Sequence, residues 1–316
     1  MNELEEVDSP IETSAPDAPD RLLVCCISRE ERCLGTLGRL AKDYSADKAL
    51  VFSKEDEGSG QADHMQEALD VLRPISEVES LSRTSTDPAE TARLSRPYLQ
   101  ESTSEQGAIL LDITSFQKSE ILLLLRLFNE TDVTDRVRIT YSEPEDYDIQ
   151  SIRPRGLSNV SIVPTFKAPY KSQQGVTLVL FLGYEGDRAL ATWENIEPNS
   201  TVAVIARPAY HEEWEGQAER ENAALLSALS GQNIKCADSR EPQSTFDLLE
   251  QMILESGQPE QNWYVAPLGT KLQTLGIYRF ATEYSDTVSI VDSQTYDTAE
   301  EEYRPVGIGK TWLVRT

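Results

Sequence analysis

The chain has 316 residues, of which 39% are hydrophobic, and it carries a formal net charge of -25 at pH 7. This composition excludes wholesale disorder, and the length suits two domains of about 150 residues each. Because nucleic-acid backbones and anionic membranes attract proteins mainly through Lys and Arg, the acidic charge disfavours both as general partners.

The first twenty residues, MNELEEVDSPIETSAPDAPD, lack the apolar core of a signal peptide and predict a disordered acidic tail at 1–20. The sequence contains no run of about 18 apolar residues, so we expect no membrane span and a cytoplasmic protein. The 20 arginines and 9 lysines are outnumbered by 54 acidic residues, a balance typical of proteins from salt-loving microbes. We expect the acidic surface to serve solvation.

Apolar runs and helical periodicity in the first half alternate along the chain, which predicts a parallel sheet with helices on both faces. We assign this first Rossmann-like unit to 21–165. Its strands are expected at 22–27, 49–52, 108–112 and 137–141, and its helices at 30–42, 62–72, 88–99 and 118–128.

The second half repeats this alternation after a polar linker at 166–175, and we assign a second Rossmann-like unit to 176–316. Its strands are expected at 176–182, 202–206, 233–237, 263–266 and 288–291, and its helices at 188–196, 214–229, 244–254 and 272–280. The predicted fold class is therefore α/β, with two tandem Rossmann-like units built on mainly parallel sheets.

Three similarities in the same order predict that the two units arose by internal duplication. VCCISREERCLGTL at 24–37 resembles LFLGYEGDRALATW at 180–193, which aligns Arg32 with Arg188. ILLDITSFQKSEILLLLRLF at 109–128 parallels WYVAPLGTKLQTLGIYRF at 263–280, and RPRG at 153–156 corresponds to RPVG at 304–307. The alternative is coincidence between ordinary strand–helix units. Duplication requires the same strand order in both sheets.

Ligands of open parallel sheets bind beyond the carboxyl ends of the strands, where helix N-termini attract anions. In the second unit, PLGTK offers Gly269 for close backbone approach, the Thr270 hydroxyl and the Lys271 charge. In the first unit, DITSFQK offers four comparable side chains, namely Asp112, Thr114, Ser115 and Lys118. These residues indicate a phosphate site with Asp112 orienting a ribose or an amine. The alternative is that Thr270 or Ser115 merely caps a helix.

The loops after the first strand of each unit, SREER and GYEGDR, contribute Arg32, Glu185 and Arg188 as further candidate ligand-binding residues. Mixed charges at this position also suit a solvated helix N-terminus, whose dipole favours acidic residues. Neither loop contains GxGxxG, and the chain has no GxxxxGK[ST] P-loop. Likewise we find no catalytic GxSxG or HExxH motif, and the cysteines and histidines lack a zinc-binding spacing. We therefore predict no bound metal and no cofactor, and the sequence assigns no catalytic residues.

A unit whose fourth strand leads through a Thr- and Lys-containing loop into an apolar helix resembles the CARF-like ligand-sensing domains of prokaryotic defence, which bind cyclic oligonucleotides. Their usual loop resembles TGGTK, which Gly269, Thr270 and Lys271 match and Leu268 does not. In the first unit Thr114 and Lys118 are comparable, but the glycines are missing. The resemblance covers one loop in each unit and the order of the elements. It implies dimerisation and a separate effector protein.

The leading functional hypothesis is a non-catalytic sensor or interaction module that binds a nucleotide-like anion at the strand ends and signals to a separate protein partner. An alternative is a metal-assisted enzyme acting on a nucleotide or phosphorylated metabolite, with Asp112, Glu185 and Asp187 as its carboxylates. A third hypothesis is a structural subunit of a protein complex. A homodimer is compatible with each of them.

Overall fold

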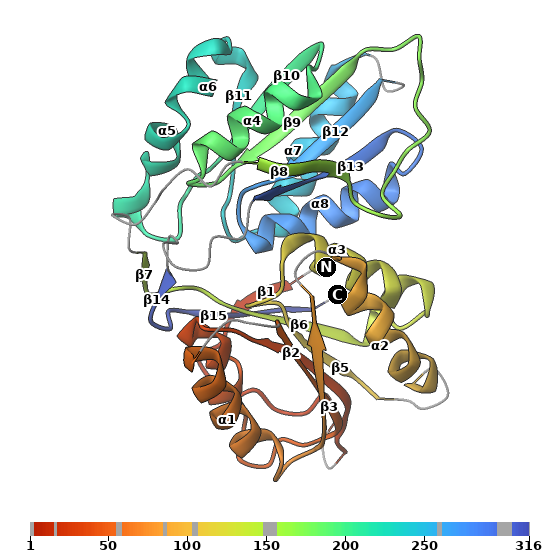
Figure 1. The fold of residues 1–316 in the computed structure, drawn as a ribbon, viewed down its shortest axis with the longest axis vertical. Coiled ribbons are helices and arrows are strands. Elements are labelled where there is room, and N and C mark those ends of the chain that lie inside the picture. The colour runs from red at the N-terminus through yellow and green to blue at the C-terminus, as the bar shows by residue number, and fades with distance from the viewer. Residues whose placement is uncertain are drawn as a thin grey trace. The chain divides into compact units, whose positions relative to one another are not determined.

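A computed structural model describes residues 3–15, 18–54, 59–84, 87–102, 107–147, 157–257, 261–295 and 305–315. The chain divides into two compact units, and each has a sheet with its own helices (Figure 1). The first unit combines residues 1–150 with 303–316, and the second comprises 151–302.

The first unit is built on a seven-stranded sheet of order β1-β15-β6-β5-β2-β3-β4. Its five parallel strands are β2 (Asp20–Ile27), β3 (Ala46–Lys54), β4 (Glu77–Arg83), β5 (Ile109–Asp112) and β6 (Val137–Ser142). Antiparallel to β6 lies β15 (Thr311–Arg315), which in turn pairs with β1 (Glu3–Glu6). Helix α1 (Ser59–Leu72) covers one face, and α2 (Ala89–Ser102) with α3 (Lys118–Glu130) covers the other (Figure 1).

The second unit is built on a six-stranded sheet of order β11-β10-β9-β12-β13-β8. Its parallel strands are β9 (Val176–Leu182), β10 (Ser200–Ala206), β11 (Ile234–Ala237), β12 (Asn262–Pro267) and β13 (Val288–Thr295), and β8 (Leu157–Ile162) runs antiparallel to β13. Helix α4 (Gly186–Ile196) packs against α6 (Ala223–Ala228), next to α5 (Gln217–Glu221). Helix α7 (Pro242–Glu255) packs against α8 (Lys271–Glu283).

The two sheets share one strand order. With the parallel strands of each unit numbered along the chain, both sheets read 3-2-1-4-5, followed by an antiparallel strand beside strand five. The predicted α/β class with two tandem, mainly parallel sheets is therefore confirmed, and the strand order meets the requirement for duplication. Of the Arg-Pro-x-Gly pair, residues 153–156 and Arg304 lie outside the described residues.

The antiparallel strands are exchanged between the units. Strand β8 follows β6 along the chain but pairs in the second unit, and β15 follows β13 but pairs in the first. The units therefore differ from the predicted ranges 21–165 and 176–316. The sequence could not reveal this, because a short strand carries little information about which sheet it joins.

The N-terminal segment differs from the predicted disordered tail at 1–20. Strand β1 pairs with β15, and Val7 and Ile11 are buried in the core of the first unit. At the start of β2, the buried carboxylate of Asp20 pairs with Arg138 and accepts a hydrogen bond from Tyr44 at 3.0 Å. Strand pairing and the buried apolar residues thus anchor this acidic segment to the sheet.

Two predicted helices are replaced by shorter elements. In place of a helix at 30–42 lie two 3-10 helices, η1 (Glu31–Leu34) and η2 (Leu37–Arg39). Gly35 separates them in close contact with β6, since a Cβ there would lie 2.3 Å from Ser142 Oγ. The predicted helix at 214–229 is divided into η5 (Glu212–Trp214), α5 and α6. Strand β4 was not predicted, because its sequence EVESLSR is polar.

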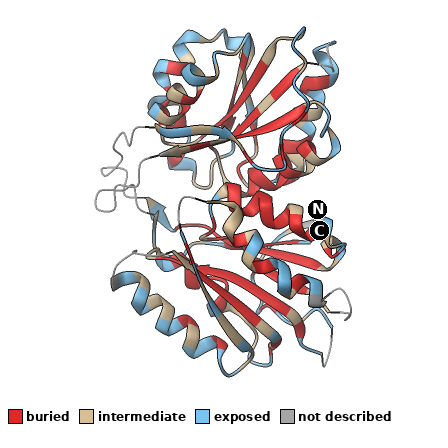
Figure 2. Ribbon diagram, turned by 45° about the vertical axis from the view of Figure 1, so that its right-hand side comes forward, coloured by how far each residue is buried: buried red, intermediate tan, exposed pale blue. Residues whose placement is uncertain are grey.

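Side chains of the first strand alternate between the two faces of each sheet, as extended backbone requires. In β2, Leu23, Cys25 and Ile27 join the apolar cluster formed with η1, η2 and α1. In β9, Leu178, Leu180 and Leu182 occupy the corresponding cluster with α4 and α6. Figure 2 shows these strands as buried within each unit. Burial on both faces explains why most of each strand, LLVCCI at 22–27 and LVLFL at 178–182, is an uninterrupted apolar run.

None of the helices in the described stretches combines the length and apolar content needed to cross a bilayer.

The cysteines test this core directly. Cys25, Cys26 and Cys33 are buried, whereas Cys236 is exposed. Burial raises the pKa of Cys33 to about 12 and also raises that of Cys25, so neither forms a thiolate near neutral pH. A chromogenic disulfide reagent should modify one thiol per folded chain, and Cys236→Ser should abolish this reaction. Rapid modification of more than one thiol in the folded Cys236→Ser protein would contradict the core described above.

Candidate functional site

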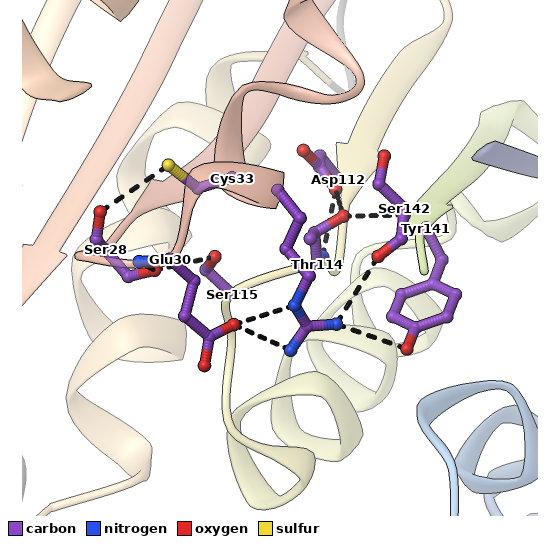
Figure 3. A network of polar contacts seen from close by, with 9 residues as sticks. Ser28, Glu30, Cys33, Asp112, Thr114, Ser115, Tyr141 and Ser142 are labelled. Carbon is purple, nitrogen blue, oxygen red and sulfur yellow. Dashed lines mark hydrogen bonds and ion pairs between the residues drawn. The ribbon is translucent and has the colours of Figure 1, made fainter. Parts of the chain in front are cut away.

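In the first unit, the loops after β2 and β5 meet at the carboxyl edge of the sheet because the two strands are neighbours. Ser28 Oγ lies 3.1 Å from Ser115 Oγ, and the Glu30 amide donates to Ser28 Oγ at 3.2 Å. The carbonyl of Ser28 accepts from Cys33 Sγ at 3.6 Å. Figure 3 shows this network, which joins the two candidate loops through short polar side chains.

Arg32 holds the first loop to the end of β6. Its Nε donates to Glu30 Oε2 at 2.8 Å, and its Nη1 lies 3.2 Å from the Tyr141 hydroxyl and 3.4 Å from the Ser142 carbonyl (Figure 3). The side chain of Arg32 is 8% exposed. The geometry therefore gives Arg32 intramolecular partners on both sides of its guanidinium.

Asp112 and Thr114 order the turn after β5. Both the amide and the hydroxyl of Thr114 donate to Asp112 Oδ1, the former at 2.9 Å. The Ser142 amide donates to Thr114 Oγ1 at 2.9 Å. Through Ser142, this turn is continuous with the Arg32 contacts, so the ends of strands one, four and five form one network (Figure 3). Within it Arg32, Thr114 and Ser142 are buried.

Helix α3 begins immediately after this turn, with Lys118 as its first residue. Its N-cap is Gln117 and not Ser115, and Glu120 Oε2 accepts from the Gln117 amide at 2.8 Å. The other oxygen of Glu120 lies 2.9 Å from Arg83 Nη1 in an ion pair whose side chains are 2% and 4% exposed, respectively. This pair ties the start of α3 to the end of β4.

The second unit repeats the arginine arrangement at the same place in its sheet. Arg188 Nη1 lies 2.8 Å from Glu185 Oε2, and Nη2 donates to the carbonyl of Ser293 in β13. Ser293 Oγ lies 2.7 Å from Thr192 Oγ1. An arginine that pairs with a nearby glutamate and binds a serine carbonyl in strand five thus occurs in both units, as the alignment of Arg32 with Arg188 predicts.

The Pro267–Lys271 loop has the capping geometry that the sequence left as an alternative. Thr270 Oγ1 accepts from the Gln273 amide at 3.1 Å and donates to the Ser239 carbonyl at 2.6 Å. Gln273 Oε1 accepts from the Thr270 amide at 3.0 Å, and a Cβ at Gly269 would lie 2.3 Å from this atom. Gly269 therefore makes room for the capping side chain, and Lys271 is the first residue of α8.

Sequence reasoning missed three residues that organise these loops: Glu120, Gln273 and Ser239. The spacing TxxQ at 270–273 is a capping-box pattern and could have revealed Gln273, whereas 117–120 has Gln in place of the usual Ser or Thr. Ser239 follows the third strand of the second unit and is 1% exposed. Its hydroxyl has no hydrogen-bond partner within the described part of the chain. No sequence signal distinguishes it from other serines.

The structure thus joins Arg32, Asp112, Thr114 and Ser115 in one network of the first unit and pairs Glu185 with Arg188 in the second. Asp187 is exposed in the first turn of α4. Within the described residues, no group of three or more His, Cys, Asp and Glu side chains is placed to hold a metal ion.

No family model matches the chain, and no curated protein matches it in sequence. Among the solved structures that match, three illustrate how weak the similarity is. Can2 from Sulfobacillus thermosulfidooxidans in complex with cyclic tetra-adenylate is 14% identical, with a TM-score of 0.27 over 38% of this chain and 31% of Can2. This chain therefore spans less than a third of that protein.

The other two cover more of both chains. A functionally unknown protein from Pseudomonas aeruginosa PAO1 is 11% identical, with a TM-score of 0.24 over 89% of this chain and 94% of that one. A putative universal stress protein from Pseudomonas aeruginosa UCBPP-PA14 is 12% identical, with a TM-score of 0.24 over 86% and 92%. The fold assignment rests on the strand order and not on these likenesses.

Removing one partner of the buried Arg83–Glu120 pair should strongly destabilise the first unit, because the other charge stays buried without its partner. Glu120→Leu removes the cap and leaves the Arg83 charge buried, so we expect the free energy of unfolding to fall by about 3 to 5 kcal/mol. Glu120→Gln places at the start of α3 the same residue type that caps α8, so it keeps the capping hydrogen bond and should lower the free energy of unfolding less than Glu120→Leu does. Glu130→Gln, which breaks a surface pair with Arg96, should change stability by less than about 1 kcal/mol. Urea unfolding measures all three, and equal stabilities of the Glu120→Leu and Glu130→Gln proteins would contradict the expectation.

Proposed function

We propose that this protein is a non-catalytic sensor or interaction module that binds a nucleotide-like anion at the carboxyl ends of its parallel strands. The candidate ligand-binding groups are those at the starts of α3 and α8 and in the adjoining loops. The similarity of the two units, as copies of one ancestral unit, is part of this proposal, because it places equivalent candidate groups in each.

The observation that carries the proposal is a lysine at the first position of the helix after strand four in both units. Lys118 begins α3 and Lys271 begins α8. A helix N-terminus carries partial positive charge, and a lysine at the same place adds a full positive charge, so the two together favour the approach of an anion. A phosphate would interact favourably with both the helix end and the ammonium group. The repetition is notable in a chain with 9 lysines among 316 residues.

The buried hydroxyl of Ser239 is a second observation in favour of a ligand site in the second unit. A buried hydroxyl without a hydrogen-bond partner costs free energy, and such groups commonly bind water, an ion or a ligand. The carbonyl of Ser239 accepts from Thr270, which places this residue next to the loop that carries Lys271. The unsatisfied hydroxyl and the lysine therefore belong to neighbouring loops at the same edge of the sheet.

The resemblance of the Gly269–Lys271 loop to CARF-like sensors favours cyclic oligonucleotides among nucleotide-like anions. Cyclic tetra-adenylate, the ligand named for Can2, is therefore the first probe to test. Because the chain shows no recognisable catalytic motif, we propose that it passes ligand binding on to a separate protein partner.

Removing the helix-start lysines should weaken anion binding. We expect Lys271→Met and Lys118→Met each to raise the dissociation constant for the bound nucleotide at least tenfold, since hydrogen bonds to charged groups contribute about 1.5 to 3 kcal/mol. Lys42→Met makes the same change at an exposed site before β3, at the opposite edge of the sheet, and should leave binding unchanged. Thermal-shift and calorimetric titrations would use cyclic tetra-adenylate, cyclic AMP and ATP in high salt. If none of these raises the melting temperature of the wild-type protein, the proposal fails.

Ser239→Ala separates a ligand-binding hydroxyl from a structural one. Because the hydroxyl has no partner among the described residues, its removal should leave the stability of the ligand-free protein unchanged or raise it by up to about 1 kcal/mol. The same substitution should weaken nucleotide binding about fivefold or more. Loss of stability on substitution, with binding preserved, would show that Ser239 is structural.

A further inference from the structure

Ser142 joins three parts of the first unit at one buried point. Its amide donates to Thr114 Oγ1 at 2.9 Å, its carbonyl accepts from Arg32 at 3.4 Å, and its hydroxyl lies 2.9 Å from Thr311 Oγ1. Ser142, Thr114 and Thr311 are fully buried. The first two contacts hold the candidate loops after β2 and β5. The third reaches β15, at the other end of the chain.

Residues of β15 and of the segment before it also contact the end of β6. The carboxylate of Glu143 accepts a hydrogen bond from Trp312 Nε1 at 2.6 Å, and the backbone amide of Glu143 donates to the Lys310 carbonyl at 2.8 Å. Gly35 lies against both parts, because a Cβ at this position would be 2.3 Å from Ser142 Oγ and 3.0 Å from Ile308 Cγ2. The C-terminal segment therefore packs against the end of β6 and against the loop that carries Arg32.

The second unit lacks this link. There the equivalent serine hydroxyl, Ser293 Oγ, binds Thr192 of its own first helix, and the residue opposite Ser293 in the antiparallel strand is Val160. In the first unit the threonine at the position corresponding to Thr192, Thr36, binds Thr140 instead, at 3.1 Å. The hydroxyl of strand five is thus directed to the exchanged strand in one unit and to the first helix in the other.

We propose that Thr311 and Ser142 are positioning residues through which the C-terminal strand β15 controls the candidate anion site of the first unit. This inference rests on the proposed function for its ligand, but the coupling itself concerns the free protein. With β15 in place, Ser142 is held and orders the Arg32 and Thr114 loops. When β15 is displaced, both loops lose the same anchor. By linkage, an anion that binds the ordered loops tightens the pairing of β15 to the same extent.

Hydrogen exchange of the full-length protein without ligand tests the coupling. Thr311→Val keeps the shape of the side chain and removes the hydroxyl. We expect it to speed amide exchange in the peptides covering 28–40 and 112–117 about fivefold, the factor that one net hydrogen bond corresponds to. Thr311→Ser restores the hydroxyl and should restore protection. If Thr311→Val speeds exchange in β15 alone, or if Thr311→Ser behaves like Thr311→Val, the proposal is overturned.

A glycine pair supplies an independent variant. Gly35→Ala drives a methyl group into Ser142 and should speed exchange in β15 as well as in 112–117. Gly38→Ala adds the same methyl group where nothing lies within 4 Å and should change neither. Equal exchange in the two alanine variants would contradict the proposed contact.

The ligand arm uses cyclic tetra-adenylate with the same proteins. Thr311→Val should weaken its binding about fivefold, and bound nucleotide should slow exchange in β15. If the wild-type protein binds no nucleotide while the coupling is present, the proposed function fails and the positioning role stands. Nucleotide binding that is unchanged by Thr311→Val would overturn the positioning role alone.

Discussion

The guanidinium of Arg32 is the group on which the carboxyl edge of the first sheet depends. A buried charge is stable only when it is paired and hydrogen-bonded, so Arg32 requires Glu30, Tyr141 and the Ser142 carbonyl to stay where they are. These partners belong to the first loop and to strand five, which lie on either side of strand four. Arg188 imposes the same constraint in the second unit through Glu185 and Ser293. The arginines therefore fix the frame in which any ligand would bind.

The two units solve one further problem differently. In each unit, a side chain at the start of the helix after strand four contacts the end of strand three. The first unit uses the charged pair of Glu120 with Arg83, and the second uses Gln273, whose amide donates to the Ala237 and Asp238 carbonyls. A buried ion pair tolerates little displacement because separation exposes both charges to an apolar environment. The neutral amide of Gln273 makes the same connection without burying a charge.

The sequence was sufficient for what depends on local pattern. Uninterrupted apolar runs located β2 and β9, and the aligned arginines located the equivalent contacts of Arg32 and Arg188. It was insufficient where a choice depends on distant partners. Strand β4 is polar because much of it is accessible, and nothing in TWLVR reveals that it pairs with β6. For the candidate site, the alternation of strands and helices placed the loops at the carboxyl ends of strands and left open whether Thr270 is a cap. The capping role of Thr270 and the junction at Ser142 follow only from the folded backbone.

The exchange of β8 and β15 has a consequence for synthesis on the ribosome. The second unit receives its antiparallel strand before any of its own parallel strands has been made, so its sheet can close as soon as β13 emerges. The first unit cannot close then, although its five parallel strands were made first. Its edge at β6, and with it the strand β1 near the N-terminus, has no partner until residues 311–315 are translated. The half of the protein that is made first is thus the half that is completed last.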